Sequence, residues 1–354
     1  MRQRIYLDHA STTPILPQAA TAIAEACTAW ANPSSPHQEG RKVHAAMEDA
    51  RRRVAAALGW DGSLIFTSGA TEAIALVFAR ARAKSFIVSA VEHPAVMRSA
   101  PGARQTAVRR DGTLDLDDLD RALAEGEAPL VAVQSVNNET GVIHPLAGIH
   151  ARVKAAGGLL LADCAQSAGK LKLPEADFLV IAAHKLGGPP GIGALLVKDP
   201  ATLDAIGGQE GGYRPGTPSV PLIMGFAVAS EADHGWYEEA KRLRARLDAG
   251  IVEAGGEIVA ADAPRIATIA CYRMPGVTGA AQMMQLDLAG IAVSAGSACS
   301  SGSLKTSPVL AAMGWREEEA REVIRVSFGP STCESDIDAL LAEWRGMIGK
   351  RRAA

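Results

Sequence analysis

The chain has 354 residues, of which 48% are hydrophobic and 21% charged, a composition typical of a globular protein and not of a disordered or fibrous one. Its formal net charge of -3 gives no basic excess with which to hold nucleic acid or an anionic membrane surface. The longest nearly apolar stretch, Val220 to Ala229, is about half as long as a bilayer-spanning helix, and Met1 to Leu7 does not resemble a signal peptide. We therefore expect a cytoplasmic protein without nucleic-acid or membrane partners.

Short apolar runs alternate with helical patterns through the first two thirds of the chain. Helical periodicity predicts two amphipathic helices, at Pro17–Trp30 and Gly40–Leu58. The short runs are apolar on both faces, so we interpret them as buried strands of a parallel or mixed sheet that helices cover. A binding site is then expected outside the carboxyl ends of the strands. The predicted strands are Leu64–Phe66, Ser85–Val88, Leu130–Val133, Leu159–Ala162, Phe178–Ile181 and Ala194–Val197.

The last third of the chain reads as a second, smaller domain. A helical pattern from Pro221 to Glu253 predicts one long helix that leads into it. Beyond it, the sequence predicts strands at Ile266–Tyr272, Ile291–Val293 and Val323–Ser327, and helices at Ala280–Leu288 and Ile337–Ile348.

Three predicted strands are each followed by residues that could bind or react with a ligand. A glycine turn at Gly69 leads into a helix start whose free N–H groups suit a phosphate, although Ser and Thr there are often only caps. Asp163 follows the predicted strand Leu159–Ala162 and, taken alone, is better explained as a helix cap. Lys185 follows Phe178–Ile181, where an ammonium is costly to bury unless its chemistry changes, as in a Schiff base. Pyridoxal phosphate (PLP) needs all three groups.

One of the five scattered cysteines also stands out. No C-x-x-C pair indicates zinc or a redox dithiol, so we expect free thiols and no metal site. Structural cysteines prefer apolar surroundings. Cys299 instead lies in the small-residue run Ser294–Ser303, which makes it a candidate reactive thiol.

These residues together resemble the cysteine desulfurases of NifS/IscS type, within the class V aminotransferases of PLP fold type I, over nearly the whole chain. The matching segments are Tyr6 to Asp8 with Thr12 to Pro14, Asn32 to His37, Thr67 to Glu72, Glu92-His93, Val136 to Glu139, Asp163 with Gln166, His184-Lys185, Gln209-Glu210, Arg214 with Gly216-Thr217, Ser294 to Cys299, and Ile324-Arg325 with Ser327.

The resemblance implies an α/β fold with two domains. The large, PLP-binding domain would span residues 14–235 and hold a mainly parallel seven-stranded sheet covered by helices. The smaller α+β domain would combine residues 1–13 with 236–354. It would carry the cysteine loop and the arginine that binds the substrate carboxylate.

The resemblance also assigns roles to single residues. Lys185 would form the Schiff base and act as the base at the substrate α-carbon, and Cys299 would be the nucleophile. His93 would stack on the ring and, as a third catalytic residue, shuttle protons. The remaining cofactor contacts would be Asp163 at the pyridine nitrogen, Asn138 and Gln166 at the phenolic oxygen, and Ala70, Thr71, His184 and, from the neighbouring subunit, Thr217 at the phosphate. Arg325, Asn138 and Asn32 would bind the substrate.

The implied reaction converts L-cysteine to L-alanine and leaves the sulfur as a persulfide on Cys299. A protein acceptor of iron–sulfur cluster or thio-cofactor synthesis would then take the sulfur from a homodimeric enzyme. The cysteine loop, Ser294 through Ser307, resembles the long form that hands sulfur to protein acceptors.

Four residues and the early end of the chain depart from the family pattern. Ala182 stands where a phosphate-binding serine is common, so we expect weaker cofactor retention; Ile74, Ala75 and Pro215 also differ near the phosphate loop. The chain ends soon after the predicted Ile337–Ile348 helix, from which we expect a different acceptor or docking mode.

Two other functions remain open at this point. The same fold and cofactor serve aminotransferases and selenocysteine lyases, and the Cys299 thiol is the feature that argues against transamination. A catalytically inactive homologue that acts as a binding subunit is the third hypothesis. The complete set of Lys185, Asp163, His93, Cys299 and Arg325 argues against it.

Overall fold

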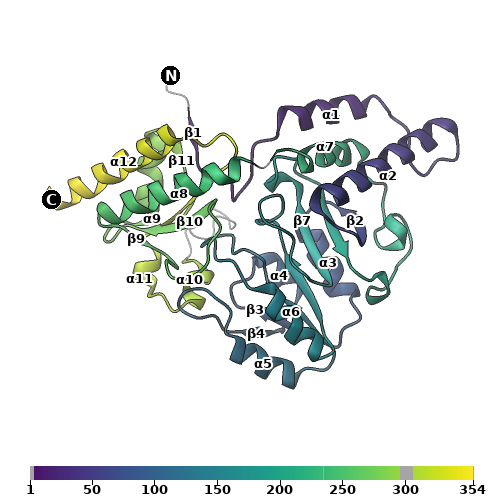
Figure 1. Ribbon diagram of the computed structural model, residues 1–354, viewed down its shortest axis with the longest axis horizontal. Helices are drawn as coiled ribbons and strands as arrows, with labels where there is room; N and C mark the ends of the chain where they lie inside the picture. The colour runs from purple at the N-terminus through teal and green to yellow at the C-terminus, as the bar shows by residue number, and fades with distance from the viewer. Residues whose placement is uncertain (1–3, 234, 296–305, 354) are drawn as a thin grey trace.

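The computed structural model describes residues 4–233, 235–295 and 306–353, with the side chains of 350–353 left aside. Within that part, seven strands form a mixed sheet in the order β2-β8-β7-β6-β5-β3-β4 (Figure 1). β8 runs antiparallel to both of its neighbours, and the other strands run parallel to one another. The strands are β2 (Ser63–Thr67), β3 (Ser85–Ser89), β4 (Arg104–Thr106), β5 (Pro129–Ala132), β6 (Leu159–Asp163), β7 (Phe178–Ala182) and β8 (Gly193–Val197).

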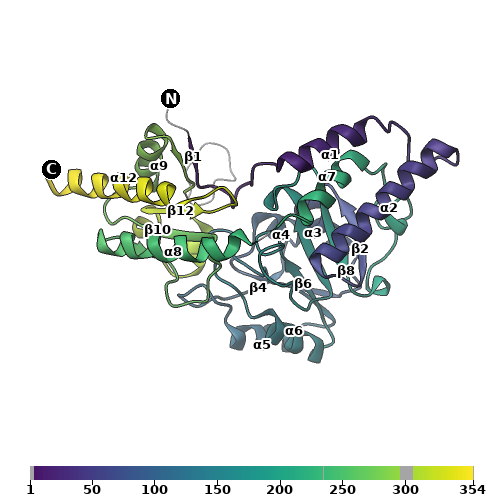
Figure 2. The ribbon, with the colours of Figure 1, turned by 45° about the horizontal axis from the view of Figure 1, so that its top comes forward.

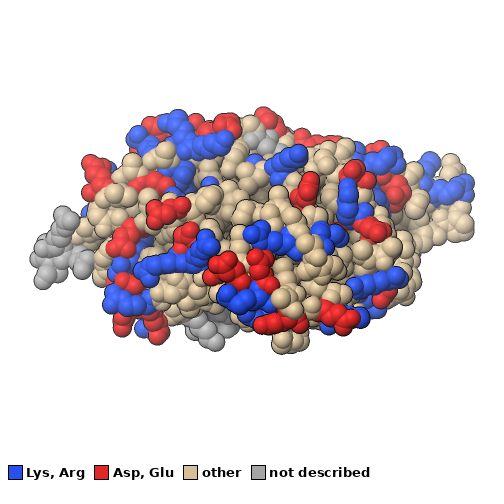
Figure 3. Space-filling model, turned by 60° about the horizontal axis from the view of Figure 1, so that its bottom comes forward, with Lys and Arg blue, Asp and Glu red and all other residues tan. Residues whose placement is uncertain are grey.

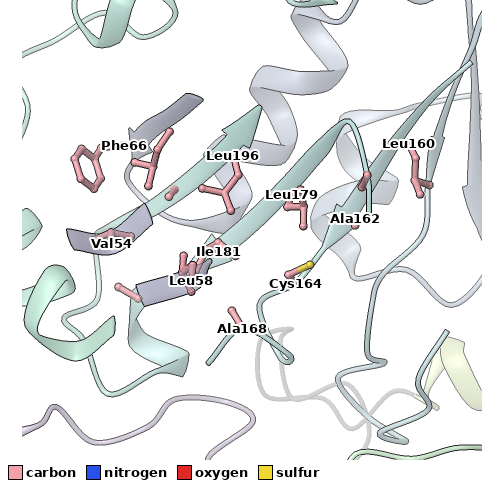
Figure 4. Close-up of a cluster of buried hydrophobic side chains, with 14 of the residues drawn as sticks. Val54, Leu58, Phe66, Leu160, Ala162, Cys164, Ala168, Leu179, Ile181 and Leu196 are labelled. Carbon is pink, nitrogen blue, oxygen red and sulfur yellow. The ribbon is translucent and has the colours of Figure 1, made fainter. Parts of the chain in front are cut away.

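Helices cover both faces of this sheet, which explains why its strands are apolar on both sides. The helices are α1 (Pro17–Cys27), α2 (Gln38–Leu58), α3 (Ala70–Arg80), α4 (Pro94–Ser99), α5 (Leu116–Glu125), α6 (Leu146–Ala155) and α7 (Val220–Ser230). On one face, α2, α5, α6 and α7 pack against side chains such as Phe66, Leu179 and Leu196 (Figure 4). On the other face, α3 and α4 pack against the alternate residues, such as Ile65 and Val180.

A second unit, on the left in Figures 1 and 2, has its own core. It contains the antiparallel sheet β12-β10-β9 and the parallel pair β1-β11. Leu7, which follows β1, is fully buried in this core, so the start of the chain packs with its last third. The elements are β1 (Ile5–Tyr6), β9 (Glu257–Ile258), β10 (Ile269–Arg273), β11 (Ile291–Ala292), β12 (Val323–Ser327), α8 (Trp236–Glu253), α9 (Gly279–Leu288), α10 (Pro308–Ala312), α11 (Glu317–Ala320) and α12 (Glu334–Ala353).

These two cores support a domain division at residues 13/14 and 235/236, which we propose as the boundaries. The prediction of one long helix from Pro221 to Glu253 was wrong, because α7 ends at Ser230 and α8 begins at Trp236. The Ser230 hydroxyl bonds back to the carbonyl of Phe226, and the Asp233 carboxylate accepts from the N–H of Gly235. Side-chain bonds of this kind compete with helical backbone bonds and favour a turn.

Three smaller differences have local causes. The first helix ends at Cys27 and not at Trp30. The hydroxyl of Thr28, directly after the helix, donates to a carbonyl of its last turn. The strand predicted from Ile266 begins at Ile269, because the N–H of Ile266 bonds to the carbonyl of Gly141 instead of joining the sheet. The edge strand β4 was not predicted, since its three residues carry no apolar run.

The surface carries charges of both signs. On the face in Figure 3, Lys and Arg lie interspersed with Asp and Glu. No helix in the described part of the chain is long and apolar enough to cross a membrane.

Candidate active site

A cavity of about 530 Å³ lies at the carboxyl ends of the sheet strands. The residues that follow β2, β3, β5, β6 and β7 supply much of its wall, as the position of sites in open α/β sheets predicts. Arg325, from the middle of β12 in the second unit, adds a guanidinium. Both units therefore build the site.

Nine of the twelve predicted site residues line this cavity: Ala70, Thr71, His93, Asn138, Asp163, Gln166, His184, Lys185 and Arg325. Asn32, predicted to bind the substrate, does not line it. Asn32 and Thr217 instead line a separate hollow of about 360 Å³ together with Trp30, which is 82% exposed. Within one chain the structure thus does not bring these two residues to the cavity, and Cys299 lies outside the described residues.

Lys185 occupies the short 3-10 turn Ala183–Lys185 directly after β7. Its Nζ donates hydrogen bonds to the backbone carbonyls of Ala10 and Ser11, the second at 2.7 Å. Thr13 donates from Oγ1 to the Lys185 carbonyl at 3.3 Å. The start of the chain therefore holds the lysine amine in place through neutral acceptors.

His93 and Asp163 are the titratable pair beside this lysine. The Nδ1 of His93 accepts from the N–H of Ala95 at 3.2 Å, so the neutral ring carries its proton on Nε2. Burial lowers the pKa of His93, which keeps the ring neutral at pH 7. Burial raises the pKa of Asp163, against the hydrogen bond from Ala165 and the positive charge of Lys185. A further cation against Asp163 would hold it ionised.

The turn between β2 and α3 forms an anion cradle. Gly69 precedes the helix with φ +148°, and no side chain caps the first turn of α3. Gly69, Ala70 and Thr71 line the cavity there, so free N–H groups and the positive end of the helix face it. A Cβ on Gly193 would lie 2.8 Å from the Gly69 Cα, so glycine is required for β8 to pass this close.

Ala182 also lines the cavity, at the end of β7, and it brings no hydroxyl. The local difference from the family pattern that the sequence indicated is therefore present at the cavity wall.

Two buried oxygens in the cavity wall have no hydrogen-bond partner among the described residues. They are the Oε1 of Gln166 and the Oε2 of Glu92. The other end of Gln166 donates to the carbonyl of Ala10 at 2.9 Å, and the other oxygen of Glu92 accepts from the N–H of Gln134 at 2.7 Å. Unpartnered buried polar atoms are costly, so a bound molecule with polar groups fits this cavity.

Arg325 is 5% exposed overall and is held from three sides. Its guanidinium donates to Asp8 Oδ1 at 2.8 Å, to Ser11 Oγ at 2.7 Å and to the carbonyl of Asn138 at 2.9 Å. Its Nε is buried without a partner among the described residues. Such a fixed guanidinium suits the carboxylate of a small molecule.

The residues on both sides of the segment that carries Cys299 form hydrogen bonds with residues of the cavity wall. Ser294 exchanges backbone hydrogen bonds with Arg325, at 3.1 and 2.7 Å. Ser307 donates to the buried carboxyl of Glu139 and caps α10, whose first residues, Pro308 and Val309, line the cavity. Cys299 is five residues from Ser294 and eight from Ser307.

Several wall residues were not predicted as site residues. Ala10 and Ser11 act through backbone carbonyls, which side-chain patterns do not reveal. Gln134 follows a buried strand as a polar residue, the signal that located Asp163 and Lys185, and it could have been found in the same way.

Comparisons with known proteins identify the family of the chain. The model of the family described as aminotransferase class-V matches residues 5–340. The chain is 36% identical to a cysteine desulfurase of Gluconacetobacter diazotrophicus, covering 98% of this chain and 94% of the relative. It is also 36% identical to an IscS-like cysteine desulfurase of Mycobacterium tuberculosis, covering 99% and 97%. The solved NifS-like protein from Rickettsia africae superposes with a TM-score of 0.89 at 29% identity, covering 98% of this chain and 100% of that one. The chain belongs to the aminotransferase class-V family.

Proposed function

We propose that the protein is a PLP-dependent cysteine desulfurase that converts L-cysteine to L-alanine and keeps the sulfur as a persulfide on Cys299. The observation that carries this proposal is the arrangement of Lys185, Asp163, His93 and Arg325 around one cavity whose wall also holds an anion cradle. Members of the family generally depend on PLP, and the relatives reported above are named as cysteine desulfurases.

The residues present fit PLP. The Gly69 turn would take the phosphate, Asp163 the pyridine nitrogen, His93 the ring face and Lys185 the aldehyde carbon. Gln166 and Asn138 would lie at the phenolic oxygen, and the Oε1 of Gln166, which has no partner among the described residues, would accept from the phenolic hydroxyl. Bound there, PLP supplies a carbonyl that captures the substrate amine and a ring that takes up electrons from the α-carbon.

The protein's own groups would then direct the substrate. Arg325 would hold the carboxylate, which fixes the α-carbon relative to Lys185. The Lys185 amine would take the α-proton, and the backbone carbonyls of Ala10 and Ser11 would keep the resulting ammonium in place. The Nε2–H of His93 would serve as a neutral hydrogen-bond donor inside the cavity.

Cys299 would carry the sulfur chemistry. Its thiolate attacks the sulfur of the bound cysteine, an S–S bond forms, and the bond between that sulfur and the β-carbon breaks with its electron pair left on carbon. Alanine is completed when this carbon takes up a proton and Lys185 returns the proton to the α-carbon, so no external oxidant is needed. The flanking residues Ser294 and Ser307 support this role, because they form hydrogen bonds with Arg325 and Glu139 of the cavity wall.

We also propose a homodimer and a protein acceptor for the sulfur. The hollow around Asn32 and Thr217, beside the exposed Trp30, supports a second copy at this surface, because large exposed apolar groups mark interfaces. Thr217 would then act on the partner's cofactor phosphate.

The test measures sulfide and alanine released from L-cysteine in the presence of a reductant, together with the absorbance spectrum. The wild type should be yellow and release equal amounts of both products. Cys299→Ala should stay yellow and release neither, whereas Lys185→Ala should lose the lysine-linked absorption band. Cys333→Ala, at an exposed cysteine outside the cavity, is the matched control and should keep full activity.

Two outcomes would contradict the proposal. A yellow wild type that leaves L-cysteine intact would point to another amino-acid substrate, such as selenocysteine or an aminotransferase substrate. A colourless wild type would favour the binding-subunit hypothesis.

A further inference from the structure

An acidic side chain stands beside the anion cradle. Glu72, the third residue of α3, lines the cavity next to Ala70 and Thr71. One of its oxygens accepts from the N–H of Ser68, and the other accepts from Nε of Arg214 at 2.8 Å. Both partners are fixed parts of the chain, so the position of the carboxylate is fixed as well.

Glu72 carries a negative charge at neutral pH. Burial raises the pKa of this carboxyl, but the hydrogen bonds from Arg214 and from Ser68 outweigh burial and hold the pKa below its ordinary value. A carboxylate beside a phosphate group is repulsive, and the repulsion is stronger in a partly enclosed cavity than in water. Arg214 therefore offsets a charge that would otherwise oppose an anion in the cradle.

The loop that carries Arg214 is attached at a second point four residues earlier. The side chain of Glu210 is fully buried and accepts from both terminal nitrogens of Arg51, at 2.6 and 3.0 Å, and from the N–H of Phe66 at 2.8 Å. Phe66 belongs to β2, which leads into the cradle. Glu210 also adopts φ +53°, a costly conformation for a residue other than glycine.

Arg214 is thus placed by the fold and is not an incidental surface partner. Glu210 attaches the loop to β2, on one side of the turn between β2 and α3. Arg214 binds Glu72 of α3, on the other side of that turn. The two side chains of the Arg214–Glu72 pair are 21% and 32% exposed, less than in most surface ion pairs of this chain. Partly buried pairs are screened by salt less than exposed ones.

We propose that Arg214 is a positioning residue for the cofactor phosphate: by pairing with Glu72 it neutralises the carboxylate beside the cradle and so sets the affinity for the phosphate group. The inference rests on the proposed use of PLP, and it concerns Arg214, which does not itself line the cavity.

The test compares two ligands, PLP and pyridoxal, which lacks the phosphate, on the full chain stripped of its cofactor. Arg214→Met should weaken PLP binding about tenfold and change pyridoxal binding less than about twofold, because only the phosphate meets the unpaired charge of Glu72. Adding Glu72→Gln to Arg214→Met should restore PLP binding to within about twofold of the wild type. Raising the salt concentration should shrink the loss.

The matched control is Arg82→Met, which removes a 2.8 Å Nε-to-carboxylate pair with Asp204 away from the cavity and should leave both affinities unchanged. Equal weakening of PLP and pyridoxal by Arg214→Met, or no rescue by Glu72→Gln, would overturn the inference. A wild type that binds PLP but releases no sulfide would contradict the desulfurase proposal and leave the role of Arg214 standing. A wild type that binds no PLP would overturn both.

Discussion

Arg325 and Asp8 form an ion pair at the cavity, with Nη2 2.8 Å from Oδ1, and the arginine side chain is 6% exposed. The same guanidinium is held by the neutral oxygens of Ser11 and Asn138. Asp8 therefore competes for the positive charge with any carboxylate that enters the cavity, while the neutral contacts keep Arg325 oriented.

We predict that Asp8→Asn lowers the KM for L-cysteine about threefold with little change in kcat. The amide oxygen can still accept from Arg325, but the competing negative charge is gone. Arg325→Lys should raise KM at least about tenfold, because an ammonium cannot keep the three-sided contact. Steady-state kinetics of sulfide release check both, and a rise in KM for Asp8→Asn would show that the charge of Asp8 is needed to orient Arg325.

Ala182→Ser should tighten PLP binding. Ala182 is 2% exposed and ends β7 at the cavity wall, so a serine there adds a hydroxyl beside the phosphate position. We expect the dissociation constant to fall about threefold to tenfold, within the range of one ordinary net hydrogen bond. Dialysis against buffer, followed by the absorbance of the retained cofactor, measures this, and unchanged retention would show that the missing hydroxyl is of no consequence.

Gly193→Ala should destabilise the protein and loosen the cradle. Its Cβ would lie 2.4 Å from the carbonyl oxygen of Ile181 and 2.8 Å from the Gly69 Cα, both backbone atoms. Forced shifts in packed structure cost about 1–3 kcal/mol. Gly148→Ala is the control, because this exposed glycine of α6 has nothing within 4 Å of its Cβ position. It should raise stability by about 0.5–1 kcal/mol in urea unfolding. A Gly193→Ala variant as stable as the wild type would contradict the prediction.

His144 should make stability fall in weak acid. It is 3% exposed, and burial lowers its pKa to about 4. Since the unfolded chain protonates this ring near pH 6.5, the unfolded state binds more protons between the two values. The contribution is complete above about pH 6.5 and is lost as the pH falls, amounting to about 2 kcal/mol between pH 7 and pH 5.

The comparison for this prediction is His144→Leu, with His144→Gln as a second variant in case the first does not fold. Either should lose less stability than the wild type between these pH values in urea unfolding. Burial raises the pKa of Glu92, which acts in the opposite direction, so the difference between variant and wild type is the informative quantity. Parallel pH curves would contradict the prediction, because they would show that His144 has the same pKa in the folded and the unfolded chain.

The sequence predicted the strands of the large sheet closely, because a strand buried on both faces is a continuous apolar run that stands out from its surroundings. It also located Asp163 and Lys185, because a charged residue directly after such a run is exceptional. The point at which one helix ends and the next begins was harder to predict from the sequence. The hydroxyl of Ser230 and the carboxylate of Asp233 divide the predicted long helix, and both residue types also occur within helices.

The sequence by itself determined that Asp163 and Lys185 stand at strand ends, since this depends on short-range pattern. Only the tertiary structure decided which of the predicted site residues meet. The start of the chain packs into the second unit, so Ala10 and Ser11 hold Lys185 through backbone carbonyls and Asp8 pairs with Arg325. It also placed Asn32 beside Thr217 in a separate hollow and Arg214 against Glu72. These contacts join residues far apart in the chain, and they depend on packing geometry that no local pattern encodes.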